Sequence, residues 1–93
     1  MGADSQNLLS VIVPFHNREE FIGQLIDTIA GQDYRALEVV AVDDGSTDGS
    51  ARVFEASKGR LSCPVNLITQ SNAGPYAARN NARGVAQGSM LAF

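Results

Sequence analysis

Cysteine, tryptophan and long apolar runs are scarce or missing in this chain of 93 residues. The single cysteine, Cys63, excludes an internal disulfide and a CxxC metal clip. It lies in a Ser-Cys-Pro loop, and we interpret it as an inert thiol rather than a nucleophile. No run approaches the roughly 18 apolar residues of a membrane-spanning helix. The polar start, MGADSQN, lacks the apolar segment of a signal peptide. We expect a cytoplasmic protein, with the inner face of the membrane as the alternative for a full-length protein.

Basic residues are also few. Seven Lys and Arg are outnumbered by ten Asp and Glu, which gives a net charge of −3. The basic patch that a nucleic acid or an anionic lipid surface would need is therefore not expected. Apolar residues make up 44% of the chain, a composition typical of a globular domain. The length is enough for one small domain.

Four β-rich apolar segments alternate with three helical patterns. We expect strands at 8–15, 37–42, 65–69 and 89–93, and helices from about 17 to 30, near 49–57, and from Pro75 to about Gln87. Strands alternating with helices pair in parallel through right-handed crossovers. The sequence therefore predicts an α/β fold: a Rossmann-like, three-layer half-domain with a mainly parallel, four-stranded sheet in the order β-α-β-α-β-α-β.

The helix boundaries carry recognisable signals. Asn17 is a candidate N-cap with Glu20 as its capping-box partner. Gly31 and Tyr34 fall where the first helix should stop, and Gly88 where the third should stop. Candidate N-caps for the second helix are Ser46, Thr47 and Asp48.

The two ends of the chain predict its domain organisation. Residues 1–7 are polar and are expected to form a disordered tail. The chain stops at Phe93, inside an apolar segment, whereas a parallel strand is normally covered on both faces. We expect residues 8–93 to be the N-terminal part of a larger domain. The alternative is a complete four-stranded domain that ends on an edge strand.

Polar residues follow each of the first three predicted strands. In open α/β sheets, ligands bind outside the carboxyl ends of the strands. The topology therefore places one group of residues on a common ligand-binding edge: Pro14, His16, Asn17, Asp43, Asp44, Gly45, Gln70, Asn72, Gly74 and Arg79.

The chemistry of this edge favours groups that donate hydrogen bonds. Neither a G-x-G-x-x-G nor a G-x-x-x-x-G-K-[ST] phosphate motif is present. Two adjacent carboxylates repel phosphate, but they accept a ring N–H or ribose hydroxyls through charge-assisted bonds. A hard cation wants more oxygen ligands than Asp43 and Asp44 supply. The alternative is that this Asp-Gly-Ser-Thr-Asp stretch only caps a helix and forms a turn.

The other candidates also have alternatives that involve no ligand. His16 would contact a base or simply be solvated in its turn. Arg79 would clamp a diphosphate, pair with Asp43 or Asp44, or lie exposed. The stretch from Asn72 to Pro75 would approach a ligand or form only a tight turn.

Three stretches together resemble a known family. SVIVPFHNREEFIGQLIDTI, EVVAVDDGSTDGS and NAGPYAARNNA occur in the order and spacing of the N-terminal half of family 2 glycosyltransferases of the GT-A fold. The resemblance runs from about Leu9 to Phe93. It implies the donor-binding part of an enzyme that moves a sugar from a nucleotide-diphosphate donor, a UDP-sugar, to an acceptor hydroxyl with inversion. The sugar and the acceptor stay undefined.

The resemblance also implies roles for particular residues. The family's V-P-x-Y-N stretch lies beside the base and ribose, and His16 stands here in place of its Tyr. In the D-D-G-S motif an aspartate binds the uracil ring N–H, and position favours Asp44 over Asp43. The Asn and Arg of the N-x-G-x-x-x-A-R-N motif would contact the nucleotide; the motif matches Asn72, Gly74, Ala78, Arg79 and Asn80.

The family's D-x-D metal motif follows the fourth strand, so its ligands would lie beyond residue 93. The resemblance implies Mg or Mn in the full-length enzyme and no metal in this part. The catalytic base is not assignable here, and we expect this part to be inactive alone.

Two other functions are alternatives to the donor-binding hypothesis. One is a non-catalytic α/β interaction module that associates through its exposed edge strand. The other is a nucleotidyltransferase, which the missing glycine-rich phosphate loop disfavours.

Overall fold

The computed structural model describes residues 8–32 and 37–92. The predicted tail at 1–7 and the predicted helix stop at Tyr34 lie outside the described residues. Within them, no helix is both long and apolar enough to cross a membrane.

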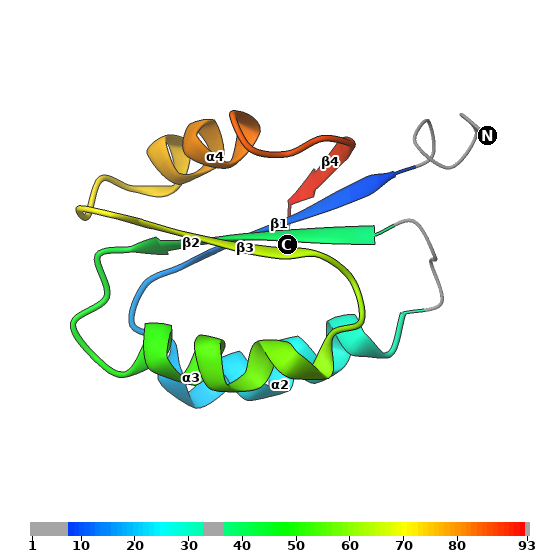
Figure 1. Cartoon of the computed structure of the whole chain (residues 1–93). Coiled ribbons are helices and arrows are strands. Elements are labelled where there is room, and N and C mark those ends of the chain that lie inside the picture. The colour runs from blue at the N-terminus through cyan, green and yellow to red at the C-terminus, as the bar shows by residue number, and fades with distance from the viewer. Residues whose placement is uncertain (1–7, 33–36, 93) are drawn as a thin grey trace.

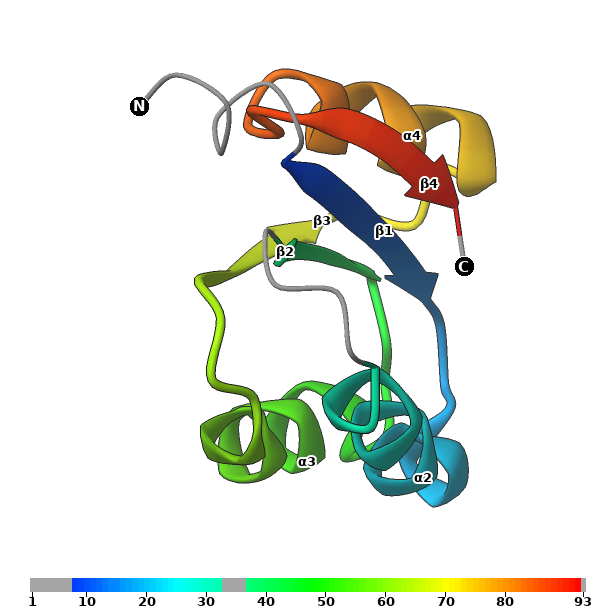
Figure 2. The same ribbon diagram turned by 90° about the vertical axis from the view of Figure 1, so that its right-hand side faces the viewer.

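The described strands form one parallel sheet. They are β1 (Leu9–Phe15), β2 (Leu37–Asp44), β3 (Val65–Gln70) and β4 (Ser89–Ala92). Their order in the sheet is β3-β2-β1-β4, with β1 and β2 in the centre (Figure 2). The register pairs Phe15 with Asp43, and Asp43 with Thr69, so the first three strands end at one level.

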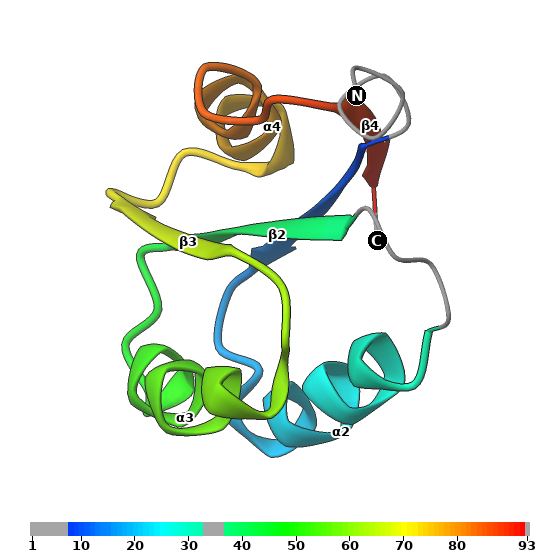
Figure 3. The same ribbon diagram turned by 45° about the vertical axis from the view of Figure 1, so that its right-hand side comes forward.

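Helices cover both faces of this sheet. They are α2 (Glu19–Ala30), α3 (Ser50–Ser57), a 3-10 turn η1 (Lys58–Arg60) and α4 (Pro75–Arg83). Helices α2 and α3 lie on one face and α4 on the other, which makes three layers (Figures 1 and 3). The predicted α/β class and the alternation of three parallel strands with three helices are confirmed; β4 pairs in parallel with β1 over four residues.

The strands supply a core to each face because side chains alternate along a strand. Val39 and Ala41 pack toward α2 and α3, together with Ile22, Ile26 and Phe54. Val40 and Val42 pack toward α4 and contact Ala78 and Ala82. The α4 side is therefore the smaller core, built from short side chains that let the helix lie close to the sheet.

The predicted cap of α2 is wrong. The N-cap position is Arg18 and has no side-chain cap bond. Asn17 instead adopts a left-handed backbone (φ 52°) and turns its side chain to the loop that follows β2. There its Oδ1 accepts bonds from the backbone N–H groups of Thr47 and Asp48. A tertiary contact has thus taken the oxygen that a local capping box would use.

Two element ends also differ from the prediction. Strand β2 continues through Asp43 and Asp44, whose side chains find partners in neighbouring loops (described below). Helix α4 ends at Arg83, not near Gln87. The N–H of Gln87 bonds to Glu38 Oε2 and the N–H of Gly88 to Ser10 Oγ, so these groups are taken by side chains of the sheet.

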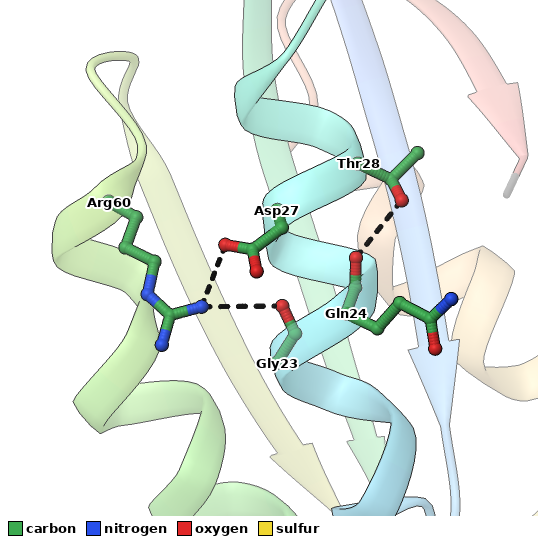
Figure 4. A network of polar contacts seen from close by, with 5 residues as sticks. All are labelled: Gly23, Gln24, Asp27, Thr28 and Arg60. Carbon is green, nitrogen blue, oxygen red and sulfur yellow. Dashed lines mark hydrogen bonds and ion pairs between the residues drawn. The ribbon is translucent and has the colours of Figure 1, made fainter.

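Helix α2 is also linked to η1 by a small polar network. Arg60 donates to Asp27 Oδ1 (2.7 Å) and to the carbonyl of Gly23 (3.4 Å), while Thr28 donates to the carbonyl of Gln24 (Figure 4). The ion pair is exposed, and such pairs contribute roughly 0.2–1 kcal/mol. Apolar packing of α2 and α3 on the sheet therefore stabilises this layer more than the ion pair does.

Cys63 packs against the α2–α3 core, where burial raises the pKa of its thiol. A raised pKa keeps a cysteine protonated, and the thiolate is the nucleophilic form. The environment therefore supports an inert thiol.

The close packing of α4 generates a stability prediction. Ala82 is fully buried against the sheet, so Ala82→Leu should overpack this interface and lower the free energy of unfolding by about 1–3 kcal/mol. Urea unfolding measures the change. Arg83→Leu, on the exposed side of the same helix, is the matched control and should change stability little. Equal effects of the two substitutions would contradict the close packing.

Candidate functional site

Three loops meet at the carboxyl ends of the strands. They follow β1 (residues 16–18), β2 (45–49) and β3 (71–74), and lie at the left of Figure 1. All the site residues predicted from the sequence lie on these loops, at the adjoining strand ends, or on the first turns of α4. The topology therefore brings them to one edge of the sheet, but it divides them among different pockets.

Asp44 organises the loop after β3. Its Oδ1 accepts bonds from the backbone N–H of Ala73 (2.8 Å) and from the amide of Gln70 (2.8 Å). Its Oδ2 accepts a bond from the backbone N–H of Gly74 (3.0 Å) and a long one from the side chain of Asn72 (3.4 Å). The carboxylate is 7% exposed, and these four donors replace the water that burial removes.

These bonds favour the charged form of the carboxyl. The N–H of Ala73 contributes most to lowering the pKa of Asp44, followed by the amide of Gln70, and together they outweigh the opposing effect of burial. Asp44 is therefore an anion at neutral pH, and its negative charge lies at the first turn of α4, where the helix dipole favours it.

Asp43 faces the opposite side of the sheet, because adjacent residues of a strand alternate. Its Oδ1 accepts a bond from the backbone N–H of Ser46 (2.9 Å), which closes the turn after β2. The two aspartates therefore do not form one site. Within residues 8–32 and 37–92, no cluster of three or more His, Cys, Asp or Glu side chains could hold a metal ion.

Asn17 interlocks the loops after β1 and β2. Besides accepting two backbone bonds through Oδ1, it donates its own N–H to Ser46 Oγ (2.9 Å). Nearby, Glu19 Oε1 accepts the N–H of Gly49 (2.5 Å). Asp48 Oδ1 accepts the Ser50 hydroxyl, the main reason that the pKa of Asp48 is lowered. The Asp-Gly-Ser-Thr-Asp stretch thus forms turns, around Asp43 and Asp48 rather than Asp44. The predicted N-caps Ser46, Thr47 and Asp48 are wrong, because the N-cap position of α3 is Gly49 and has no side-chain cap bond.

The orientation of Asn17 determines the tautomer of His16. Because Asn17 Oδ1 accepts two N–H groups, its Nδ2 is the atom that faces His16 Nε2 at 3.3 Å and donates to it. His16 Nδ1 lies 2.8 Å from the carbonyl oxygen of Asp44, which can only accept. These contacts favour a proton on Nδ1, and they hold the ring in place.

An open pocket of about 190 Å³ lies between these groups and the start of α4. Its lining includes three of the residues predicted from the sequence, Pro14, His16 and Asp44. Sequence reasoning missed the other three, which form its apolar walls: Phe15, Pro75 and Ala78. The apolar periodicity assigned Phe15 and Ala78 to the core, and no sequence signal separates a core position from the wall of a pocket.

The remaining predicted residues lie around this pocket. Asn72 does not line the pocket, but it donates to the carbonyl of Asp44, which does (3.1 Å). Arg79 lines a neighbouring pocket with Pro75 and Tyr76. The ion pairs found among the described residues join Lys58 to Glu55 and Arg60 to Asp27, so the expected alternative of an Arg79–aspartate pair is not observed. Tyr76, which sequence reasoning missed, is 81% exposed beside Arg79.

Comparison with known proteins identifies the family. The family model described as glycosyl transferase family 2 matches residues 10–93. This chain belongs to that family. The matched region includes every residue of the edge described above, so the family assignment and the loop geometry concern the same part of the molecule.

Several family 2 relatives are similar over nearly the whole chain. TarS of Staphylococcus aureus, a poly(ribitol-phosphate) β-N-acetylglucosaminyltransferase, is 37% identical over 90% of the chain. The uncharacterised glycosyltransferase YibD of Escherichia coli is 37% identical over 97% of it. The chain spans 15% of the length of TarS and 26% of that of YibD.

Solved family 2 structures share the fold. S. aureus TarS 1–349 in complex with UDP superposes with a TM-score of 0.79 at 36% identity, over 92% of this chain and 26% of that one. A mannosyltransferase from Pyrobaculum calidifontis, in complex with GDP-Man and Mn²⁺, gives a TM-score of 0.77 at 32% identity, over 87% of this chain and 25% of that one.

Two glycines at the ligand-binding edge allow a first test of its geometry. Gly45 (φ 71°) and Gly74 (φ 93°) both need a left-handed backbone. A Cβ at Gly45 would also lie 2.6 Å from the backbone nitrogen of Asn72, whereas one at Gly74 meets open space. Gly74→Ala should cost about 1–3 kcal/mol in stability through strain. Gly45→Ala should lower stability more, because the added methyl group would also push the loop after β2 away from the loop after β3. Thermal unfolding compares them, and a smaller loss for Gly45→Ala would contradict the contact.

The lowered pKa values of Asp44 and Asp48 predict acid sensitivity. A carboxylate whose pKa is lower in the folded chain stabilises the fold fully above its unfolded pKa, and loses that contribution as the pH falls through its folded pKa. The urea midpoint should therefore decline from about pH 5 downward. The decline should be shallower in Asp44→Asn than in the wild type. Glu55→Gln, a variant at an exposed carboxylate on α3, is the control, and a wild-type slope for Asp44→Asn would refute the role of Asp44.

Proposed function

We propose that this chain is the donor nucleotide-sugar-binding portion of a glycosyltransferase that moves a sugar from a nucleotide diphosphate to an acceptor hydroxyl with inversion. The observation that carries the proposal is the pocket at the strand ends, walled by Pro14 and Pro75 and reached by the charged Asp44. Its setting in a family 2 fold, similar to that of TarS in complex with UDP, supports the same assignment.

The base of the nucleotide occupies this pocket in our proposal. Of the two aspartates, only Asp44 lines it, because Asp43 faces the α2–α3 side. The bond from Asn72 Nδ2 to Asp44 Oδ2 is long, at 3.4 Å, so Oδ2 is the oxygen best able to exchange a donor. A ring N–H, as uracil carries, takes that position, and the fixed His16 ring borders the base.

The diphosphate extends over the start of α4. Arg79 is exposed and lines the neighbouring pocket together with Pro75 and Tyr76. An arginine binds phosphate oxygens in a bidentate manner, and its charge offsets the repulsion that Asp44 exerts on a diphosphate. The two pockets share Pro75, so one extended ligand can fill both.

The transfer itself follows from the donor chemistry. The acceptor oxygen attacks the anomeric carbon, the bond from that carbon to the phosphate oxygen breaks, and a nucleoside diphosphate leaves. The acceptor proton passes to a base that we do not assign. Asp43 and Asp44 are both engaged by backbone donors, so neither fits this role. The described residues also do not fit the Mg²⁺ or Mn²⁺ that we expect for the full-length enzyme.

Binding of UDP tests the proposal. Titration of the isotope-labelled chain with UDP to millimolar concentration should shift the NMR peaks of residues 14–17, 43–45 and 72–79. Asp44→Ala should abolish these shifts, since it removes the acceptor of the ring N–H. Glu55→Ala, which removes an exposed carboxylate on α3 far from the pocket, should leave them unchanged.

The same titration has clear contrary outcomes. Absence of shifts at these residues in the folded wild type would refute nucleotide binding by this chain. Shifts that persist in Asp44→Ala and vanish in Asp43→Ala would show that Asp43, not Asp44, binds the ring N–H of the base. Ribose 5-phosphate, which lacks the base, should leave the peaks around His16 in place.

A further inference from the structure

Glu38 is a buried carboxylate that the proposed nucleotide site does not use. It lies on β2 at the amino end of the sheet, the end opposite the pocket, and is 5% exposed. Its Oε2 accepts the hydroxyl of Ser10 on β1 (2.5 Å) and the backbone N–H of Gln87 (2.7 Å). Ser10, itself fully buried, accepts the N–H of Gly88 through its Oγ (2.9 Å). A buried charge with these partners calls for an explanation, since its desolvation is costly.

The backbone groups that this network binds both belong to the connection between α4 and β4. Gln87 and Gly88 are the last residues before β4, and the next N–H, that of Ser89, bonds to the carbonyl of Leu8. A Cβ at Gly88 would collide with that carbonyl, so the connection lies directly on the start of β1. The network thus determines where β4 begins beside β1, and its register pairs Ile12 with Ala92.

Glu38 and Asp44 are six positions apart on β2. Because side chains alternate along a strand, this even spacing puts both on the α4 face. Asp44 binds the backbone immediately before α4, at Ala73 and Gly74. Glu38 binds the backbone shortly after α4, at Gln87. Two carboxylates of β2 therefore hold the helix at both ends.

The helix needs such anchors because its own packing is weakly directional. The residues of α4 that are buried on the sheet are two alanines, Ala78 and Ala82. An alanine buries little apolar area and has no side-chain shape that would stop the helix from sliding along the sheet. Hydrogen bonds to a charged acceptor, by contrast, depend on distance and direction and are stronger than neutral ones.

We propose that Glu38 is a positioning residue for the nucleotide pocket. Through Ser10 and the backbone of residues 87–88 it sets the register of β4 and holds the carboxyl end of α4, whose first turns carry Pro75 and Ala78 of the pocket wall. The part of the proposal that concerns nucleotide affinity rests on the proposed function. The part that concerns α4 and β4 does not.

Hydrogen exchange followed by NMR tests the positional part without any nucleotide. Glu38→Leu keeps a similar volume but removes the acceptor, so the amides of residues 87–91 should exchange about tenfold faster or more, while those of β2 and β3 change less than about twofold. Glu38→Gln retains a neutral acceptor and should restore much of the protection. Ser10→Ala should raise exchange at the same amides, and the double variant should add little, because both residues act in one network.

Val53→Ala is the matched control for general loss of stability. Val53 packs in the α2–α3 core, away from the network, so its truncation should destabilise the fold without selective exchange at 87–91. UDP affinity, measured in the same variants at equal folded fraction, should fall about threefold or more in Glu38→Leu and stay near the wild-type value in Val53→Ala.

Distinct results would overturn each part. Unchanged exchange at 87–91 in folded Glu38→Leu or Ser10→Ala, or faster exchange spread evenly over the sheet, would refute the positioning role. Selectively faster exchange at residues 87–91 in Glu38→Leu, together with an unchanged UDP affinity, would refute the link to the pocket. If the wild type itself fails to bind UDP, the proposed function fails, and the exchange data alone decide whether Glu38 positions α4 and β4.

Discussion

A single buried carboxylate, that of Asp44, gathers four donors from residues 70–74 at the end of β2. Three of those donors, Asn72, Ala73 and Gly74, lie in the short connection from β3 to α4, so this charge decides where α4 begins. The pocket wall at Pro75 and Ala78 and the exposed face at Arg79 follow from that start. This part of the ligand-binding edge is therefore built by backbone N–H groups that bond to the carboxylate of Asp44.

The alternation of side chains along β2 gives its acidic residues separate tasks. Asp43 closes the turn toward α3, while Asp44 and Glu38 face α4 from the two ends of the strand. Each is buried, and each is satisfied by backbone donors of segments that carry little apolar surface of their own. Charge thus positions loops in this fold where hydrophobic packing cannot, and the cost of burying it is offset by several directed bonds.

The regular elements were largely predictable, because their apolar periodicity is a local signal that tertiary contacts reinforce. Predictions failed where a side chain had two candidate partners. Asn17 has a local capping role available, yet it bonds to Thr47 and Asp48 across the edge. Gln87 looked helical, yet its N–H bonds to Glu38. An acceptor that is distant in the sequence can fit the backbone better and so override a local preference. The sequence does not show which distant groups lie close together in space.

The sequence by itself determined the α/β alternation, the approximate position of each strand, and the set of residues from which a ligand site could be built. It determined these because periodicity and strand polarity are properties of short segments. Only the tertiary structure decided which members of that set share a pocket. It placed Asp43 and Asp44 on opposite faces, joined the His16 ring to the carbonyl of Asp44, and added Phe15, Pro75 and Ala78 as walls. Those outcomes depend on register and on competition among buried polar groups, which no segment specifies alone.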